Sequence, residues 1–490
     1  MARTLSYQVG ILTLGRFAAY LAMFFVPLVN VRTLSVHDYG IYRQYWLLFE
    51  TISPLLIMSF DQSLFYYLPR ARDHREKSIY VTQTVLFLIV MGTVSWGVYG
   101  VLHAVLGEGL GGVVKEYFWH LCLFTLFMMT SHYMESLFVA EKQVERQARY
   151  QVVTSTVQAV TVILISYFTR NVSLLVWGLT LFAAVKFIFS LAYVVRVYRP
   201  SLSKVSIHSI QEQFSYALPL GMAAIVLLLL TQTDKFIITK ALGREAFAIY
   251  SIGAFQIPFI GIIRTSITSI TFPLMAKLQS EGKHGEILEL WQRATLKTAT
   301  LFFPIFVLLE VVARPFITIL FRETYAAAVP VFMIYLLLFL RTTVETGGVI
   351  MVFKKNPFLL KVNLISFVAN IILSVLMYLQ FGRLGVPAAT VIVVYLRNGL
   401  NMMKAGQLLG VPFSRLMPWM SLGKRLGLAL AVGIPLYILE RNIAVDNVIE
   451  LGLTGLAYLV VYFAVSLRLR FITIAEIRAI FARPAGPGAG

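Results

Sequence analysis

The sequence predicts an all-α polytopic membrane protein of about 14 transmembrane helices: two six-helix lobes related by a parallel pseudo-repeat, plus two C-terminal helices. The first observation is composition, because 58% of the 490 residues are apolar and 13% are charged, with a mean hydropathy of +0.78. Soluble domains are far less apolar than this. The others are a series of long apolar segments and an internal repeat.

Two stretches that lie 208 residues apart read alike, namely Arg32 to Tyr42 and Lys240 to Tyr250. In each, an apolar segment ends in a short polar turn with a cation, and an aromatic-small-Ile-Tyr step opens the next segment. Only Leu, Ile and Tyr are identical, but each copy follows the first apolar segment of one half of the chain. Duplicated halves of this kind are typical of transporters.

Fourteen apolar segments approach the roughly 20 residues that a membrane-spanning helix needs. They are 8–29, 41–66, 79–105, 117–140, 152–168, 173–195, 214–237, 247–272, 294–312, 329–352, 358–379, 385–408, 422–439 and 448–467. An even number of spans predicts that both ends of the chain lie on one side.

The Lys and Arg residues between these segments predict the orientation, because cationic loops stay in the cytoplasm. With the N-terminus inside, the inner loops carry twenty-six of them and the outer loops carry ten. Both termini are therefore predicted to be cytoplasmic. We interpret the first segment as a permanent helix and not as a cleaved signal peptide, because it is long and contains Arg16.

The basic stretch from Arg196 to Gln213, with Pro200, is the predicted linker between the lobes. Both lobes then begin inside, which makes the repeat parallel. The predicted domains are the N-terminal lobe (1–200), the C-terminal lobe (201–410), two extra transmembrane helices (411–470) and a cytoplasmic segment (471–490). Residues 471–483 have helical apolar spacing suited to the inner membrane surface, and the Pro- and Gly-rich tail is predicted to be disordered.

Several function classes are disfavoured by what the sequence lacks. The +19 net charge is scattered between apolar runs, which indicates membrane topology and no nucleic-acid partner. Metal-binding, phosphate-loop and nucleophile motifs are missing, and so is a loop large enough for a soluble catalytic domain. We therefore expect no enzyme, metal or cofactor, and we interpret the one cysteine, Cys122, as a packing residue.

The loop totals include cations close to segment ends, and six further cations lie inside apolar segments. Arg43 is near a predicted helix end and can extend to the interface, whereas the others lie deep; these are Arg16, Lys186, Arg264, Arg341 and Arg397. A cation at the bilayer centre costs about 2.5 to 3.5 kcal/mol, so it faces water or a partner. The carboxylates at similar depth are Glu50, Asp61, Glu135, Glu310 and Glu345.

Two interpretations of the deep cations stay open. Arg341 and Glu345 are four residues apart and would neutralise one another on one helix face. The remaining cations are not obviously matched by carboxylates, which favours a central cavity that binds an anionic substrate. Phosphate or pyrophosphate fits, because guanidinium groups bind its oxygens in pairs.

Several stretches resemble the bacterial polysaccharide flippases, the O-antigen and lipid-linked oligosaccharide translocases of the multidrug/oligosaccharidyl-lipid/polysaccharide exporter superfamily. They are Gly15-Arg-Phe, Val31 through Tyr42, Thr233-Asp-Lys-Phe-Ile-Ile, Gly243 through Tyr250, and Thr271-Phe-Pro-Leu-Met-Ala-Lys-Leu278. The resemblance extends over nearly the whole chain through the six-six-two helix plan. It specifies the superfamily better than the substrate.

The resemblance implies a V-shaped pair of lobes in the bacterial inner membrane that opens alternately to each side. The implied substrate is an undecaprenyl-pyrophosphate-linked oligosaccharide, moved from the inner to the outer leaflet for surface polysaccharide biosynthesis. Implied partners are that lipid-linked oligosaccharide, membrane lipids, and the polysaccharide polymerase and chain-length machinery. Related flippases often carry a first-helix cation where Arg16 lies, whereas the other four cations are assigned from depth.

We expect ion or potential coupling through one or more of Glu50, Asp61, Glu135 and Glu345. Two alternatives remain. A multidrug extruder would share the lobes but favours acidic cavity residues, against which the deep cations argue. A membrane-embedded glycan polymerase or ligase needs a catalytic periplasmic loop, and none is evident.

Overall fold

The computed structural model describes residues 5–105, 107–200, 205–255, 257–442 and 447–472. Over these residues the regular secondary structure is helical and contains no strand, which confirms the all-α prediction. Ten helical stretches in the described residues are long and apolar enough to cross a membrane. The chain is therefore a multi-pass membrane protein, and the count of fourteen spans stays a prediction.

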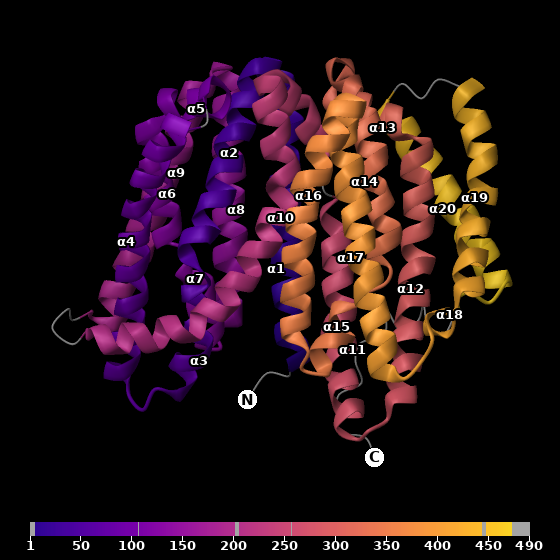
Figure 1. The fold of residues 1–490 in the computed structure, drawn as a ribbon. Coiled ribbons are helices and arrows are strands. Elements are labelled where there is room, and N and C mark those ends of the chain that lie inside the picture. The colour runs from indigo at the N-terminus through magenta and orange to yellow at the C-terminus, as the bar shows by residue number, and fades with distance from the viewer. Residues whose placement is uncertain (1–4, 106, 201–204, 256, 443–446, 473–490) are drawn as a thin grey trace. The chain divides into compact units, whose positions relative to one another are not determined.

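The chain forms two compact units, Met1–Ser251 and Ile252–Gly490. Figure 1 shows the first in indigo to magenta and the second in rose, orange and yellow. The predicted domain limits at residues 200, 410 and 470 stay predictions. Beyond residue 472, the predicted amphipathic segment and tail lie outside the described residues.

Unit 1 contains twelve elements, several of which are pieces of one interrupted helix. They are α1 (Leu5–Thr33), α2 (Val36–Ile57), η1 (Phe60–Ser63), α3 (Leu64–Tyr67), η2 (Leu68–Arg70), α4 (His74–Val105), α5 (Gly107–Glu116), α6 (Phe118–Thr130), α7 (Tyr133–Ala140), α8 (Val144–Thr169), α9 (Val172–Tyr198) and α10 (Ile207–Gly253). Helix α1 packs along α8, and α6 packs between α4 and α9. Through these contacts, the charged faces of α1, α7, α8 and α9 belong to one helix bundle.

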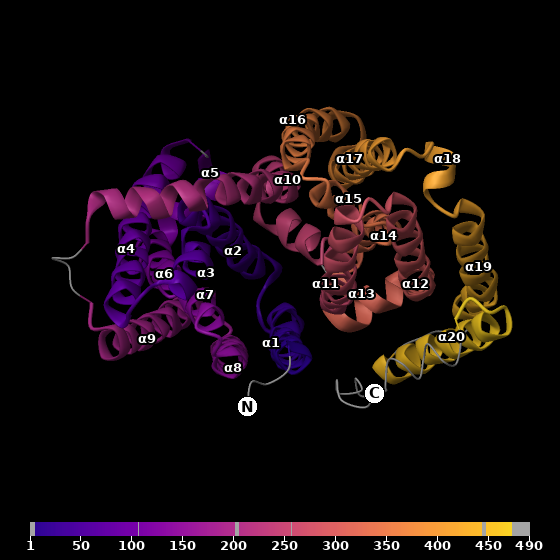
Figure 2. The same cartoon turned by 90° about the horizontal axis from the view of Figure 1, so that it is seen from below.

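Helix α10 has 47 residues and joins unit 1 through polar contacts. The Gln213 amide donates hydrogen bonds to Ser63 (2.6 Å) and Thr84 (2.9 Å). Gly221 lies against the Met58 carbonyl, where α2 ends in a left-handed turn. In Figures 1 and 2 the first part of α10 crosses α4 before the helix turns to run beside α2. The linker predicted from Arg196 to Gln213 is shorter, because α9 continues to Tyr198 and α10 begins at Ile207.

The first copy of the repeat contains the predicted turn, and the second contains a kink within one long helix. In the first copy, α1 ends at Thr33, and Ser35 caps α2 by accepting a hydrogen bond from the Asp38 N–H at 3.0 Å. In the second, Gly243 interrupts α10 with a φ of 80°, a conformation open to glycine. The copies also touch one another, since Gly40 lies against the Arg244 carbonyl.

Unit 2 repeats this plan and adds two helices. Its elements are α11 (Pro258–Ser280), α12 (His284–Val311), α13 (Ala313–Phe321), η4 (Glu323–Ala328), α14 (Val329–Thr342), α15 (Gly347–Val352), α16 (Asn356–Phe381), η5 (Gly382–Leu384), α17 (Gly385–Leu409), α18 (Phe413–Leu416), α19 (Trp419–Asn442) and α20 (Val448–Arg468). Figure 2 shows α11, α12 and α14 clustered and α19 and α20 outside α12; α12 packs against α11, α14 and α19.

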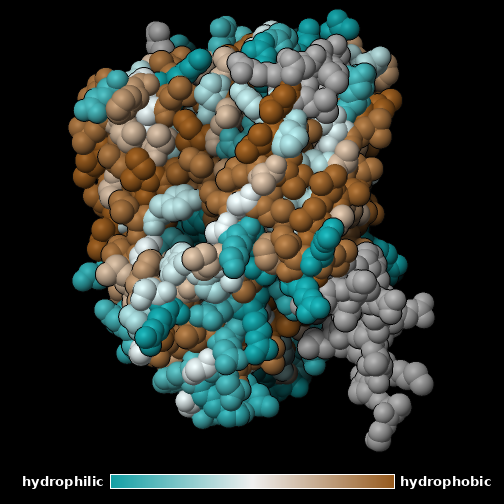
Figure 3. All heavy atoms as spheres, turned by 90° about the vertical axis from the view of Figure 1, so that its right-hand side faces the viewer, coloured by the Kyte–Doolittle hydropathy of each residue, from teal (hydrophilic) through white to brown (hydrophobic). Residues whose placement is uncertain are grey.

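The outer face of α19 and α20 is suited to lipid. Exposed apolar residues along it include Leu430, Ile434, Leu453, Leu456 and Val460. Figure 3, the view from this side, shows hydrophobic side chains across its middle and hydrophilic ones toward its top and bottom. Such a belt is expected where a helix contacts hydrocarbon along its length and water at its end.

Candidate functional site

A break between two short helices of unit 2 carries a carboxylate. Helix α14 ends at Thr342 and α15 begins at Gly347, so Glu345 lies in a non-helical link. β-Branched residues and glycines are poor helix formers, and the link and its exit consist largely of them. Glu345 Oε1 accepts a hydrogen bond from the Gly347 N–H at 3.0 Å, which satisfies one donor at the start of α15.

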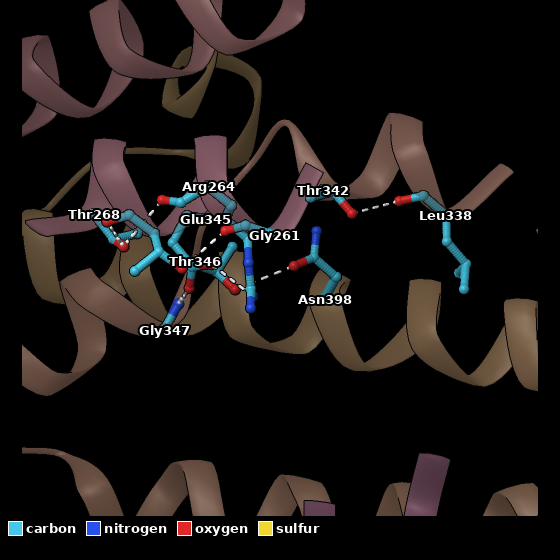
Figure 4. A network of polar contacts seen from close by, with 10 residues as sticks. Gly261, Arg264, Thr268, Leu338, Thr342, Glu345, Thr346, Gly347 and Asn398 are labelled. Atoms are coloured by element: carbon cyan, nitrogen blue, oxygen red, sulfur yellow. Dashed lines mark hydrogen bonds and ion pairs between the residues drawn. The ribbon is translucent and has the colours of Figure 1, made fainter. Parts of the chain in front are cut away.

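Glu345 pairs with a cation from another helix. Its Oε2 lies 3.8 Å from Nη1 of Arg264 in α11, and the side chains are 32% and 49% exposed, respectively. The four-residue spacing of Arg341 and Glu345 predicted one shared helix face. Because the helix ends at Thr342, the two residues do not share one continuous face. Figure 4 shows Arg264 and Glu345 side by side next to the Thr346–Asn398 hydrogen bond of 3.1 Å.

Two further cations lie near this pair and leave unit 2 with an excess of positive charge here. Arg341 interacts electrostatically with Arg264, Glu345 and Arg397. Its Nε is buried and has no hydrogen-bond partner among the described residues. Arg397 in α17 donates to the Asn363 side chain at 3.5 Å. Three guanidinium groups thus share the neighbourhood of one carboxylate.

The Arg264–Glu345 pair lines a cavity of about 580 Å³ within unit 2. Its wall is rich in hydroxyl groups from α11, α12 and α14; they belong to Thr265, Thr268, Ser269, Thr271, Thr295, Thr298, Thr342 and Thr343. Six of the threonines donate to carbonyls of their own helix. Their oxygens therefore remain acceptors, and the wall combines methyl groups, acceptors and one guanidinium donor. A cavity of this size accommodates a small polar ligand.

Unit 1 contains a second ion pair at a helix break. Arg16 of α1 lies 3.4 Å from Glu135 of α7, and both side chains are 45% exposed. Helices α6 and α7 are separated by Ser131 and His132, three residues before Glu135. Lys186 of α9 interacts electrostatically with Glu135 and lies 6.0 Å from the Tyr150 ring centroid.

The other two carboxylates of the predicted ion-coupling set have different surroundings. Asp61, in η1, is almost fully buried and accepts a 2.7 Å hydrogen bond from Ser136. His132 lies 4.0 Å from the same oxygen. Glu50 is exposed on α2 and interacts electrostatically with Arg43.

The structure therefore brings Arg264, Arg341, Arg397 and Glu345 together in unit 2, and Arg16, Lys186 and Glu135 together in unit 1. Sequence reasoning missed Arg43 and Lys235. Arg43 lies two turns inside α2, not near its end, and its buried Nε has no hydrogen-bond partner among the described residues. Lys235, at the end of predicted segment 214–237, was counted with the outer-loop cations; it lies within α10, and its Nζ donates a hydrogen bond to the Gln232 side chain at 2.6 Å. No sequence signal reveals that α10 continues past residue 237.

Metal ligands do not gather in the part of the chain that the structure describes. No group of three or more His, Cys, Asp and Glu side chains there is placed to hold a metal ion. The charged groups of the candidate site are instead arginine, lysine and single glutamates.

Comparison with known proteins gives one family match. Residues 29–330 match the model of the family described as polysaccharide biosynthesis protein. A curated relative, the teichuronic acid biosynthesis protein TuaB of Bacillus subtilis (strain 168), is 34% identical over 100 residues. That stretch covers 20% of this chain and 20% of the relative, so the chain spans about a fifth of the relative's length in this match.

Solved structures of membrane transporters share the fold. The lipid II flippase MurJ in an inward closed conformation matches with a TM-score of 0.70 and 13% identity, over 93% of this chain and 99% of that one. An inward-facing multidrug resistance transporter of the MATE family matches with a TM-score of 0.63 and 13% identity, over 81% and 94%. At these identities the likeness concerns the fold.

Proposed function

We propose that this chain, which belongs to the polysaccharide biosynthesis protein family, moves an undecaprenyl-pyrophosphate-linked oligosaccharide across the bacterial inner membrane. The direction is from the inner to the outer leaflet, by alternating access, for surface polysaccharide biosynthesis. The family and the fold are those of membrane transporters and not of enzymes.

The observation that carries this proposal is the set of half-exposed charges in the middle of apolar helices. Arg16 and Arg264 lie in α1 and α11, and their side chains are 45% and 49% exposed. A charge at membrane depth does not face hydrocarbon, so these side chains line water-filled space. Arg341, Arg397 and Lys186 add positive charge, which favours a phosphate-bearing substrate over a cationic drug.

The hydroxyl-lined cavity of unit 2 supports a glycan as the other part of the substrate. Sugar hydroxyl groups both donate and accept hydrogen bonds, and the cavity wall offers threonine acceptors together with Arg264. The prenyl chain would stay in the lipid. The name of the Bacillus relative, teichuronic acid biosynthesis protein, supports a role in the biosynthesis of an acidic polymer.

The remaining features of the proposal follow from charge distribution and chemistry. Both termini lie in the cytoplasm, because the basic residues concentrate in the loops on that side. Coupling to an ion or to the membrane potential runs through one or more of Glu50, Asp61, Glu135 and Glu345. The flipped substrate passes to a polysaccharide polymerase and its chain-length machinery.

The test is the sidedness of lipid-linked glycan in a deletion strain. Wild type is expected to relieve inner-leaflet accumulation, whereas Arg264→Gln and Arg397→Gln are expected to leave it. Arg293→Gln is the matched control, because Arg293 is an exposed partner of Glu289 on the α11–α12 hairpin. Unchanged glycan sidedness in the deletion strain, together with altered drug susceptibility, would replace this proposal with the multidrug extruder.

A further inference from the structure

The two units correspond helix by helix at a nearly constant offset. Helices α4 and α12 begin at His74 and His284, which are 210 residues apart. The interrupted pair α6–α7 ends at Ala140 and its counterpart α14–α15 ends at Val352, 212 residues later. Helices α8 and α9 have counterparts in α16 and α17 at similar offsets. The fourth spanning helix is therefore interrupted in both units, and the sixth packs beside it.

The interruption carries the same residue type in each unit. Glu135 and Glu345 are 210 residues apart, close to the offsets of 210 and 212 residues between the surrounding helices. Each lies at or just after the break, and each forms an ion pair with an arginine of another helix. The 11-residue repeat keeps only three identities, so the two halves have diverged widely in sequence. A glutamate at the matching break of both halves has nevertheless been retained.

A deep cation on the sixth helix is also shared. Lys186 lies on α9 and Arg397 on the corresponding α17. Both helices contact the break of their own unit: Ser190 accepts a 2.9 Å hydrogen bond from Tyr133 through its carbonyl, and Asn398 accepts one from Thr346 at 3.1 Å. The two bonds differ in their donor and acceptor groups, but in both units a hydrogen bond joins the sixth helix to the break of the fourth.

The pairing arginine is not duplicated in the same way. Arg16 comes from α1 in unit 1, whereas Arg264 comes from α11 in unit 2. Two different helices thus supply a guanidinium to an equivalent glutamate. The shared feature is the arrangement of one carboxylate at a helix break, one arginine beside it and one cation on the sixth helix.

We infer that each unit contains an oxyanion half-site in which the glutamate is a displaceable counter-ion. The half-site of unit 1 is Arg16, Lys186 and Glu135; that of unit 2 is Arg264, Arg397 and Glu345. An incoming phosphate or carboxylate pairs with the cations in place of the glutamate, and the glutamate side chain then faces water. The inference deepens the proposed function and rests on it for the identity of the transported molecule.

Electrostatics favours this role over a fixed structural pair. The partners lie at 3.4 and 3.8 Å and are 32% to 49% exposed, so water reaches both ends of each contact. Exposed ion pairs of this kind contribute little stabilising free energy, and they open readily. Each glutamate is also outnumbered by nearby cations, so its exchange for an oxyanion of higher charge is favourable.

The experiment is calorimetric titration of inorganic pyrophosphate into the full chain in nanodiscs of zwitterionic lipid. Wild type is expected to bind two pyrophosphates per chain. Glu135→Gln and Glu345→Gln each remove one competing negative charge and are expected to tighten one site by roughly 3- to 50-fold for each unit of charge on the ligand, the range for two unit charges about 7 Å apart in effective dielectrics between 80 and 20. Lys186→Gln and Arg397→Gln are expected to weaken the same sites.

Matched controls separate charge from fold. Glu135→Asp and Glu345→Asp keep the charge and are expected to bind as wild type does. Glu281→Gln removes an exposed carboxylate from the α11–α12 connection and is expected to leave pyrophosphate binding unchanged. A titration with glucuronate distinguishes a sugar carboxylate from the carrier phosphate as the source of the oxyanion.

Equal or weaker binding in both Gln variants, or a single site per chain, would overturn the inference. The result is independent of transport. If pyrophosphate binding responds as expected while glycan sidedness ignores the protein, the half-sites stand and the proposed function fails. If glycans are flipped but the Gln variants bind like wild type, the half-sites fail and the proposed function stands.

Discussion

Gly40 leaves no room for a side chain, because a Cβ there would lie against the Arg244 carbonyl. Gly40→Ala is therefore expected to destabilise the protein by about 1 to 3 kcal/mol, the usual cost of overpacking. The measurement is the thermal unfolding temperature in detergent. Gly97→Ala is the control, since no heavy atom lies within 4 Å of a Cβ at that helical position. Equal melting temperatures for Gly40→Ala and wild type would contradict the close contact.

An ion pair outside the membrane predicts a dependence on pH. Lys283 Nζ lies 2.9 Å from Glu281 Oε2 in the α11–α12 connection. The hydrogen bond and charge of Lys283 lower the pKa of Glu281 below its ordinary 4.5. A lowered carboxyl pKa contributes stability above the ordinary value, and this is lost as the pH falls through the lowered one.

The melting temperature of wild type minus that of Glu281→Gln is therefore expected to be positive at about pH 6 and to shrink toward zero at about pH 3. Lys283→Gln removes the other partner and is expected to show the same loss. A difference that stays constant over this range would show that the pair does not act through ionisation of Glu281.

Among single residues, the deep cations were easier to identify from the sequence than the residues that they pair with. Arg16, Lys186, Arg264, Arg341 and Arg397 stand out because charge is rare in apolar segments. Their pairing depends on contacts between distant segments: Arg16 and Glu135 are 119 residues apart. The four-residue spacing of Arg341 and Glu345 predicted that they pair on one helix face. Because the helix is broken between them, Glu345 forms its ion pair with Arg264.

The packing of α10 on unit 1 depends on a buried amide. Gln213 donates hydrogen bonds to Ser63 and Thr84 at 2.6 and 2.9 Å. Gln213→Ala leaves these groups without that donor and is expected to cost about 1 to 3 kcal/mol. Gln211→Ala, at an exposed position of the same helix, is the control and is expected to melt within about 0.5 kcal/mol of wild type. Equal effects of the two variants would place α10 apart from unit 1.

Helices were predictable from hydropathy, and their interruptions were not. Each apolar segment is helical over most of its described residues, because a bilayer requires internal hydrogen bonding. The breaks at Ser131–His132 and Thr343–Thr346 occur inside segments of unchanged hydropathy. The opposite error concerns α10, whose continuation past residue 237 places Lys240 on a helix and not in a loop. Hydropathy indicates whether a segment lies in the membrane, but it does not indicate where the helix is interrupted or where it ends.

For the whole molecule, the repeat and the charge bias were readable from sequence because each sums many residues. The exposed apolar belt of α19 and α20 fits the predicted membrane embedding (Figure 3). Which end faces the cytoplasm was predicted from loop charge alone. That orientation is open to a direct measurement because the native thiol is protected: Cys122 is fully buried.

Two introduced cysteines test the orientation. Lys283 lies before α12, and Arg383 follows α16, so three passages of the chain separate them: α12, α14–α15 and α16. An odd number of crossings places them on opposite sides of the membrane. With the N-terminus inside, a membrane-impermeant maleimide is expected to label Arg383→Cys in intact cells and Lys283→Cys only after permeabilisation. The reverse pattern would invert the orientation, and labelling of both in intact cells would mean that one of the three passages does not cross the bilayer.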